Sequence, residues 1–186
     1  IRRRSGDFPT TRPLTIAAAP IIITRMDRVA VIADSHDNLR MIERAVAVIN
    51  EWGADLVVHC GDYVAPFTAE PFSKLAAPFR GVFGNNDGDR AALKRAYAPL
   101  GEINSDPHRF TFNGLSVLIT HKPRLAREAA ADAGYDLVAF GHDHHVRIEH
   151  GESLVICPGE LGGWVTGRAS IALVEVRVGI VDVEYL

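Results

Sequence analysis

Short apolar runs alternate with amphipathic segments along the first half of the chain. Each run ends in a polar loop, which is typical of strands that are buried on both faces. These runs lie at 28–33, 56–60 and 79–83. Segment 38–53 instead repeats apolar residues at helical spacing, with Asp37 or Asn38 placed to cap its start and a glycine at its end. The pattern predicts successive strand–helix units.

The second half of the chain is richer in predicted strands. Residues 108–121 predict a hairpin that turns at Asn113 and Gly114, and residues 169–186 predict two strands joined around Val178 and Gly179. Further helices are expected at 69–78, 90–99 and 124–134, and further strand–loop units at 136–145 and 153–160. These elements predict one α/β domain in which mixed sheets pack together with helices outside.

The length of 186 residues suits one domain with a substantial core. We expect residues 26–186 to form that single domain, because "MDRVAVIADSHDN" is a natural beginning for an α/β fold. Residues 1–25 are expected to be an N-terminal extension of uncertain role. The apolar run Leu14–Ile23 superficially suggests a signal peptide, but Pro20 interrupts it and no clear cleavage site follows.

Charge and cysteine usage narrow the class of protein. The formal net charge of −3 argues against a general nucleic-acid binder, which needs a basic surface. Cys60 and Cys157 are too few for a disulfide framework and sit among apolar residues, so we expect two small buried hydrophobes in a reducing, cytoplasmic setting. No stretch is long and apolar enough to predict a membrane span.

Residues that can bind metals recur in the polar loops that follow five of the predicted strands. In α/β sheets, sites gather at the carboxyl ends of strands, so we expect these separated loops to converge. A glycine precedes the second, third and fifth of these clusters, which allows a sharp turn there. In chain order the residues are Asp34 and His36, Asp62, Asn85 to Asp87, His121, and His142 and His144.

The donors comprise two carboxylates, four imidazoles and one amide oxygen. This mixture suits Mn²⁺, which we expect first, and also Ni²⁺, Co²⁺, Fe²⁺ or Zn²⁺. The set is too large for a closed tetrahedral zinc site, and its size fits two metals that share one bridging carboxylate. Two such ions would hold a hydroxide between them and clamp a phosphate opposite it, despite the acidic composition of the chain.

The ordered motifs "DSH", "GD", "GNND", "TH" and "GHDHH" resemble the calcineurin-like metallophosphoesterase superfamily. The small size, the "MDRVAVIADSHDN" opening and the late "PGE" resemble its compact bacterial and archaeal phosphodiesterase branch. The resemblance runs from about Met26 to the end of the chain. It implies a four-layer αββα sandwich with two mixed β-sheets, a dinuclear metal centre and hydrolysis of phosphoester bonds.

The resemblance also implies a role for each ligand. Asp62 would bridge both metals. The first metal would be held by Asp34, His36 and His144, and the second by Asn85, His121 and His142.

Two departures from the family pattern affect the chemistry. Asn86 stands where the family often has a histidine; it can donate a hydrogen bond to phosphate but cannot deliver a proton at neutral pH. We therefore assign Asn86 to orienting the phosphate and expect weaker catalysis on poor leaving groups. The second departure is "CPGE" where the branch usually shows N-P-G-S, and Glu160 adds negative charge that would disfavour a large polyanion there.

Several residues have plainer interpretations. Asp87 is expected to be structural, as a helix cap or as a support for its loop. His145 is expected to be exposed or to support the ligands, and Lys122 is expected to lie on solvated surface, as is Arg124. The remaining histidines match no motif and are expected to be non-catalytic; these are His59, His108 and His150.

The expected activity is that of a metal-dependent phosphodiesterase acting on a small-molecule phosphoester, which includes nucleotide-like substrates. Two alternatives remain open. One is a phosphomonoesterase or nucleotidase, and the other is a non-catalytic protein-binding scaffold such as the retromer subunit that shares the fold. The complete ligand set argues against the scaffold. Exposed β edges and the apolar "APIII" segment would support a homodimer.

Overall fold

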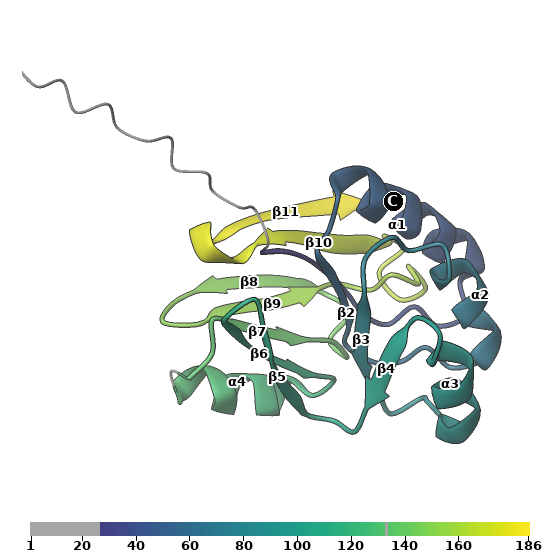
Figure 1. Ribbon diagram of the computed structural model, residues 1–186, viewed down its shortest axis with the longest axis horizontal. Helices are drawn as coiled ribbons and strands as arrows, with labels where there is room; N and C mark the ends of the chain where they lie inside the picture. The colour runs from purple at the N-terminus through teal and green to yellow at the C-terminus, as the bar shows by residue number, and fades with distance from the viewer. Residues whose placement is uncertain (1–26, 133) are drawn as a thin grey trace, which may run out of the picture.

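Two β-sheets face each other with helices on their outer surfaces (Figure 1). This arrangement comes from a computed structural model that describes residues 27–132 and 134–186. The expected extension, residues 1–25, lies outside the described residues. Within the described part, no helix combines the length and the apolar character needed to cross a membrane.

The first sheet contains six strands in the order β11-β10-β1-β2-β3-β4. Strands β1 to β4 run parallel to one another, β10 pairs antiparallel with β1, and β11 pairs antiparallel with β10. The strands are β1 (Arg28–Ile32), β2 (Leu56–His59), β3 (Phe79–Val82), β4 (Gly101–Asn104), β10 (Ser170–Glu175) and β11 (Ile180–Tyr185).

The second sheet contains five strands in the order β5-β6-β7-β9-β8. Its central strands β6, β7 and β9 are parallel, and the edge strands β5 and β8 are antiparallel to their neighbours. The expected hairpin joins β5 to β6 through Asn113 and Gly114, which both have positive φ. The strands are β5 (His108–Phe112), β6 (Leu115–Thr120), β7 (Leu137–Phe140), β8 (Val146–His150) and β9 (Leu154–Pro158).

Helices cover the outer face of each sheet. The Asn38 side chain caps the first helix by accepting the N–H of Met41, and Gly53 ends it in the left-handed conformation, as the sequence predicts. The helices are α1 (Leu39–Trp52), α2 (Ala69–Phe72), α3 (Arg90–Tyr97) and α4 (Pro123–Ala131), with short 3₁₀ turns η1 (Pro66–Thr68) and η2 (Val176–Val178).

Three apolar layers hold these elements together. A central layer between the sheets includes Val31, Val58, Ile119 and Ala139. A second layer lies between the first sheet and helices α1 to α3, and a third lies between the second sheet and α4. Cys60 and Cys157 are buried free thiols within these layers, as expected. The architecture is the αββα sandwich with two mixed sheets.

The structure differs from the predicted elements in three places. Helix α2 ends at Phe72 instead of near residue 78, because the Asn50 side chain binds the Lys74 carbonyl and the Ala76 N–H and holds that segment outside the helix. Strands β4 and β8 were not predicted. Both are short edge strands, and β8 has too few buried positions to show an apolar pattern.

Candidate metal centre

The loops after β1, β2, β3, β6 and β7 meet at one edge of the sandwich. The backbone N–H of His142, which follows β7, donates to Asp34 Oδ2, which follows β1, at 2.9 Å. The Gly162 N–H also donates to the Asp34 carbonyl at 2.8 Å. Loops from the two sheets are therefore bonded to each other where the candidate ligands lie, and the predicted convergence is present.

Asp34, His36 and His144 form the first group of ligand atoms. Asp34 Oδ1 lies 3.6 Å from His144 Nε2 and 3.9 Å from His36 Nε2. Asp34 is fully buried, and neither its Oδ1 nor His36 Nε2 has a hydrogen-bond partner. Buried polar atoms without partners are costly. A cation between these atoms would satisfy all three.

Asn85, His121 and His142 form the second group. Asn85 Oδ1 lies 2.8 Å from His121 Nε2 and 2.9 Å from His142 Nδ1, and the two imidazole nitrogens are 3.2 Å apart. His121 Nδ1 faces the Cys60 carbonyl at 2.9 Å and so carries the proton of the neutral ring. Its Nε2 is therefore a lone-pair donor that faces a carbonyl oxygen, an arrangement that a cation would stabilise.

Asp62 connects the two groups. Its Oδ2 lies 3.7 Å from His36 Nε2 in the first group and 3.4 Å from His121 Nε2 in the second. Asp62 is buried, so its charge needs partners inside the protein. The carboxylate occupies the position that a bridging ligand requires.

The protonation of the site also fits a cation. Burial raises the pKa of Asp34 to about 8; the His142 N–H opposes the rise and the carboxylates of Asp62 and Glu160 add to it. Burial lowers the pKa of His121, which keeps the ring neutral and able to coordinate. Without a cation, the Asp34 carboxyl group is more stable in its protonated form, and a divalent ion would displace that proton.

Five of the seven candidate ligands have left-handed backbone conformations. Non-glycine residues rarely adopt positive φ, and such positions cluster at functional sites. His142 and His144 therefore do not lie on an extended loop, as their alternate spacing had suggested, and they face different groups. The five residues are Asp34 (φ 53), His36 (φ 40), Asp62 (φ 62), His142 (φ 75) and His144 (φ 60).

Three glycines precede candidate ligands, and they allow the loops to pack closely more than they allow sharp turns. They are Gly61, Gly84 and Gly141, and of these three only Gly61 has a positive φ, at 96. A Cβ on Gly84 would lie 2.1 Å from Asp62 Oδ1, and a Cβ on Gly141 would lie 2.9 Å from the Cys60 carbonyl oxygen. A side chain at either position would push the ligand loops apart.

Asp87 links the loops that follow β2 and β3, which carry Asp62 and Asn85. Its carboxylate accepts the backbone N–H groups of four residues from the two neighbouring loops, at 2.7 to 3.1 Å. The donors are Asp62, Tyr63, Val64 and Gly84. Of the two structural roles expected for Asp87, loop support is the one observed, since Asp89 caps α3.

Asn86 is held against the Asp62 carboxylate. Its side-chain Nδ2 donates to Asp62 Oδ2 at 2.7 Å, and its backbone N–H donates to Asp62 Oδ1 at 2.8 Å. Asn86 therefore orients Asp62 directly. A hydrogen bond from its second amide proton to phosphate remains a prediction.

Glu160 supports His144, a role that the sequence did not reveal. Its Oε2 lies 3.1 Å from His144 Nδ1, which directs Nε2 toward Asp34. Burial alone would raise the pKa of Glu160, but hydrogen bonds from Thr166, Val165 and His144 outweigh it and lower the pKa. The charge is buried, and the expected repulsion of a large polyanion stays a prediction. The only sequence signal of this role was the departure of "CPGE" from the usual N-P-G-S.

His59 is a buried structural residue beside the centre. Its Nδ1 accepts the Gly61 N–H, so Nε2 carries the proton and donates to Ser35 Oγ at 3.0 Å. Burial lowers the pKa of His59 and keeps the ring neutral. The ring therefore ties the loop after β1 to the loop after β2, in agreement with its predicted non-catalytic role.

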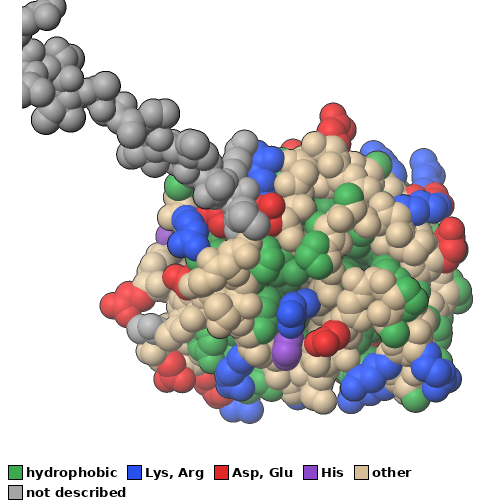
Figure 2. Space-filling view, viewed as in Figure 1, with side chains coloured by type: hydrophobic (Ala, Val, Ile, Leu, Met, Phe, Trp, Pro, Cys, Tyr) green, Lys and Arg blue, Asp and Glu red, His purple; other side chains and the backbone are tan. Residues whose placement is uncertain are grey.

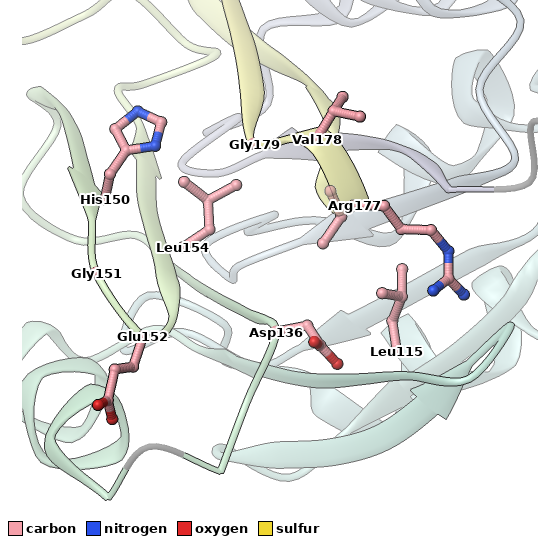
Figure 3. Close-up of a pocket in the computed structure, with 10 residues that line it drawn as sticks. Leu115, Asp136, His150, Gly151, Glu152, Leu154, Arg177, Val178 and Gly179 are labelled. Atoms are coloured by element: carbon pink, nitrogen blue, oxygen red, sulfur yellow. The ribbon is translucent and has the colours of Figure 1, made fainter.

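Two cavities differ in their relation to the centre. One of about 440 Å³ lies at the amino ends of β6, β7 and β9, between those strands and the β10–β11 connection (Figure 3). His150 lines it, and none of the candidate ligands does. The other, of about 610 Å³, is lined by Asn85, His121 and His142 together with Phe83 and Arg90, among others. The second cavity opens directly onto the second ligand group.

Comparison with known proteins supports the motif-based expectation. Residues 28–179 match the calcineurin-like phosphoesterase superfamily domain. The chain is 35% identical over 153 residues to phosphodiesterase MJ0936 from Methanocaldococcus jannaschii, covering 80% of this chain and 92% of that protein. A solved structure of an archaeal phosphodiesterase superposes with a TM-score of 0.80 at 32% identity, covering 86% of this chain and 99% of the other.

More distant structures share the fold alone. The phosphoesterase YfcE from E. coli has a TM-score of 0.56 at 16% identity, and vacuolar protein sorting 29 from Cryptosporidium parvum has 0.55 at 13%. They cover 86% of this chain and 98% and 96% of their own. At these identities the likeness shows the fold and carries no information about function. On the family match and the 35% identity, the chain belongs to the calcineurin-like phosphoesterase superfamily.

Proposed function

We propose that this protein is a divalent-metal-dependent phosphodiesterase. The main observation behind this proposal is that seven side chains bring their ligand atoms together in two neighbouring groups. Two of these atoms, Asp34 Oδ1 and His36 Nε2, are buried and have no hydrogen-bond partner. The similarity in sequence to a curated archaeal phosphodiesterase and in structure to a solved archaeal phosphodiesterase supports the reaction class.

The residues divide into two ligand groups. Asp34, His36 and His144 would hold one ion, and Asn85, His121 and His142 would hold the other. Asp62 would be shared. When bound, two such ions supply a nucleophile from water at neutral pH and offset charge on the phosphate oxygens.

The surrounding residues keep this ligand set ready. Glu160 and the Cys60 carbonyl fix the tautomers of His144 and His121, so the coordinating nitrogens need no rearrangement. Asn86 holds Asp62 and leaves one amide proton to orient a phosphate oxygen. In the reaction, a water oxygen adds to phosphorus, one P–O ester bond breaks, and solvent protonates the departing alkoxide.

We expect Mn²⁺ to support the reaction best. Three oxygen-donating and four nitrogen-donating side chains form a mixed set that also accepts Ni²⁺, Co²⁺, Fe²⁺ or Zn²⁺. The charges on the face shown in Figure 2 are of both signs and interspersed. Since the formal net charge of the chain is −3, the ions themselves would supply the attraction for phosphate.

Diester hydrolysis is favoured over monoester hydrolysis because the described centre lacks a free acid. Asn86 occupies the position where the resemblance places a histidine, and its amide cannot protonate a poor leaving group. The scaffold alternative is disfavoured because the ligand set is complete and two of its four imidazoles, His121 and His144, have their tautomers fixed.

Metal-stripped protein should be assayed with bis-(p-nitrophenyl) phosphate and p-nitrophenyl phosphate, with each of the five metals added back. We expect turnover that depends on added metal and is faster for the diester. Asp62→Ala and His142→Ala should abolish it, while the exposed Arg124→Ala should not. Faster monoester turnover would make the protein a phosphatase, and no turnover despite bound metal would favour the scaffold.

A further inference from the structure

The cavity of about 610 Å³ beside the second ligand group contains a carboxylate with an unused oxygen. Asp106, in the connection between β4 and β5, lines this cavity, and its side chain is only 9% exposed. One oxygen, Oδ1, accepts the Thr120 hydroxyl and the His121 N–H. The other, Oδ2, is buried and has no hydrogen-bond partner.

An unpartnered buried carboxylate oxygen indicates a missing donor. Leaving a buried acceptor unsatisfied is unfavourable, and such groups are rare in folded proteins. The nearest cation, Lys122 Nζ, is 3.8 Å away, which is too long for a hydrogen bond. The Lys122 side chain is 64% exposed, so it can move aside for a ligand.

The cavity in Figure 3 provides a useful contrast. It also contains an aspartate, Asp136, but Asp136 Oδ2 already accepts the Ser116 N–H at 2.7 Å. The two acids that line that cavity, Asp136 and Glu152, are exposed, so water can bind their free oxygens. Asp106 Oδ2, by contrast, is buried and has no partner at the wall of the cavity beside the metal centre.

The other walls of the 610 Å³ cavity suit a polar organic group with a nearby anion. Arg90 and Lys122 supply positive charge, and Arg90 is fixed by bonds to the Asp87 and Gly84 carbonyls. The cavity volume lies in the range of small-ligand sites, about 300–1,000 Å³, and exceeds what one phosphate needs. Carboxylates readily accept hydrogen bonds from hydroxyl groups, as they do from ribose in dinucleotide-binding folds.

We infer that this cavity binds one ester group of the phosphodiester substrate and that this group is a ribose, with Asp106 Oδ2 accepting a sugar hydroxyl. The inference rests on the proposed function, because the ester must reach phosphorus at the adjacent ligand group. Asp106 then acts as a specificity residue through hydrogen bonding, with no proton transfer to the leaving group.

The test compares p-nitrophenyl esters of a ribonucleoside 5′-phosphate and of its 2′,3′-dideoxy counterpart. Wild-type protein with Mn²⁺ should give a kcat/KM about tenfold higher for the ribonucleoside ester, the usual effect of one hydrogen bond to a charged group. In Asp106→Asn, which keeps Oδ1 and replaces Oδ2 by a donor, the ratio should fall to about one. The matched variant Asp136→Asn should keep the wild-type ratio.

Three results would overturn the inference, and they are distinguishable. A wild-type ratio near one, with bis-(p-nitrophenyl) phosphate still hydrolysed, would contradict ribose recognition and leave the proposed function intact. Absence of turnover with every diester would remove the proposed function itself and this inference with it. A glyceryl p-nitrophenyl phosphate assayed in parallel should be a poorer substrate than the ribonucleoside ester; if it is the better one, the group recognised is glycerol and not ribose.

Discussion

The imidazole of His144 is positioned by a carboxylate that is not itself a ligand. Glu160 accepts the backbone N–H groups of Trp164, Val165 and Thr166 as well as facing His144 Nδ1, so one buried side chain fixes both the ring and the neighbouring loop. Carboxylate–histidine pairs of this kind raise ligand basicity and hold ring orientation. The first ligand group therefore depends on a residue outside it.

Replacing Glu160 by Gln should weaken metal binding about tenfold, within the usual 10–100-fold effect of losing such a partner. Titration calorimetry with Mn²⁺ on metal-stripped protein would measure it. The fluorescence of Trp164, whose backbone N–H donates to Glu160, should change as well. Glu152→Gln, on the exposed β8–β9 turn, is the control. Unchanged affinity in Glu160→Gln would show that His144 needs no carboxylate.

Asp34 should make the metal-free protein less stable as pH rises. Its folded pKa of about 8 is above the ordinary value of 3.8, so the folded state binds more protons than the unfolded state between these values. Stability contributed by this group is therefore lost as pH rises through that window, at about 1.4 kcal/mol per unit.

Asp34→Asn removes this titration. In EDTA, the melting temperature of Asp34→Asn minus that of wild type should increase from pH 5 to pH 8. Added Mn²⁺ should raise the melting temperature of the wild type and have little effect on the variant. A difference that stays constant with pH would contradict the burial of an uncompensated carboxylate.

The sequence selected seven candidate ligands that the structure brings together, but it could not show how their backbones are arranged. The residue types and their order after strands were sufficient to select all seven candidates. Positive φ at His142 and His144 was not predictable, because histidine rarely adopts it and the strain is maintained by tertiary bonds such as His142 N–H to Asp34. Glu160 was missed as a support because its contact with His144 joins two loops that lie 16 residues apart in the sequence, and no local pattern reveals that contact.

At the scale of elements, Asp87 joins the loops after β2 and β3 into one unit. Replacing it by Asn would put an amide donor where Oδ2 now accepts the N–H groups of Asp62 and Gly84. We expect a loss of about 2–3 kcal/mol in the free energy of unfolding, because these buried donors lose their acceptor. Urea denaturation of the metal-free protein would measure the change.

Asp89→Asn provides the matched control for that variant. Asp89 caps α3 by accepting the Ala92 N–H, and asparagine caps helices as well as aspartate. Its free energy of unfolding should stay within about 0.5 kcal/mol of wild type. Equal losses in the two variants would mean that Asp87 has no special role in holding the ligand loops.

Strongly patterned elements were predictable, and weak edge elements were not. The α1 cap and stop and the turn at Asn113 and Gly114 follow from local chemistry, so they appear where expected. Edge strand β8 has mostly exposed side chains, and its pairing to β9 is set by the sheet instead of by its own pattern. Tertiary bonds from Asn50 likewise decide where α2 ends.

For the whole molecule, the shared layer between the sheets indicates one cooperative unit. Residues from both sheets contribute to the central core, and the metal centre is assembled from loops of both. In Trp164→Phe, the fluorescence of Trp52 on α1 and the far-ultraviolet circular dichroism should give the same urea midpoint. Separate midpoints would contradict our expectation that residues 26–186 form a single domain.

The strand–helix pattern predicted one α/β domain with mixed sheets, and the family resemblance implied the four-layer αββα sandwich that the structure has. The sequence did not reveal the cavity beside His121 or the unpartnered oxygen of Asp106. Both depend on the relative placement of β4, β5 and β6, for which no single segment carries a pattern.

The central claim is that seven side chains from both sheets hold two divalent ions. Anomalous diffraction from crystals grown with Mn²⁺ tests it most directly. We predict two peaks, one among Asp34, His36 and His144, and the other among Asn85, His121 and His142, with Asp62 contacting both. A single peak, or two peaks that do not share Asp62, would contradict the account.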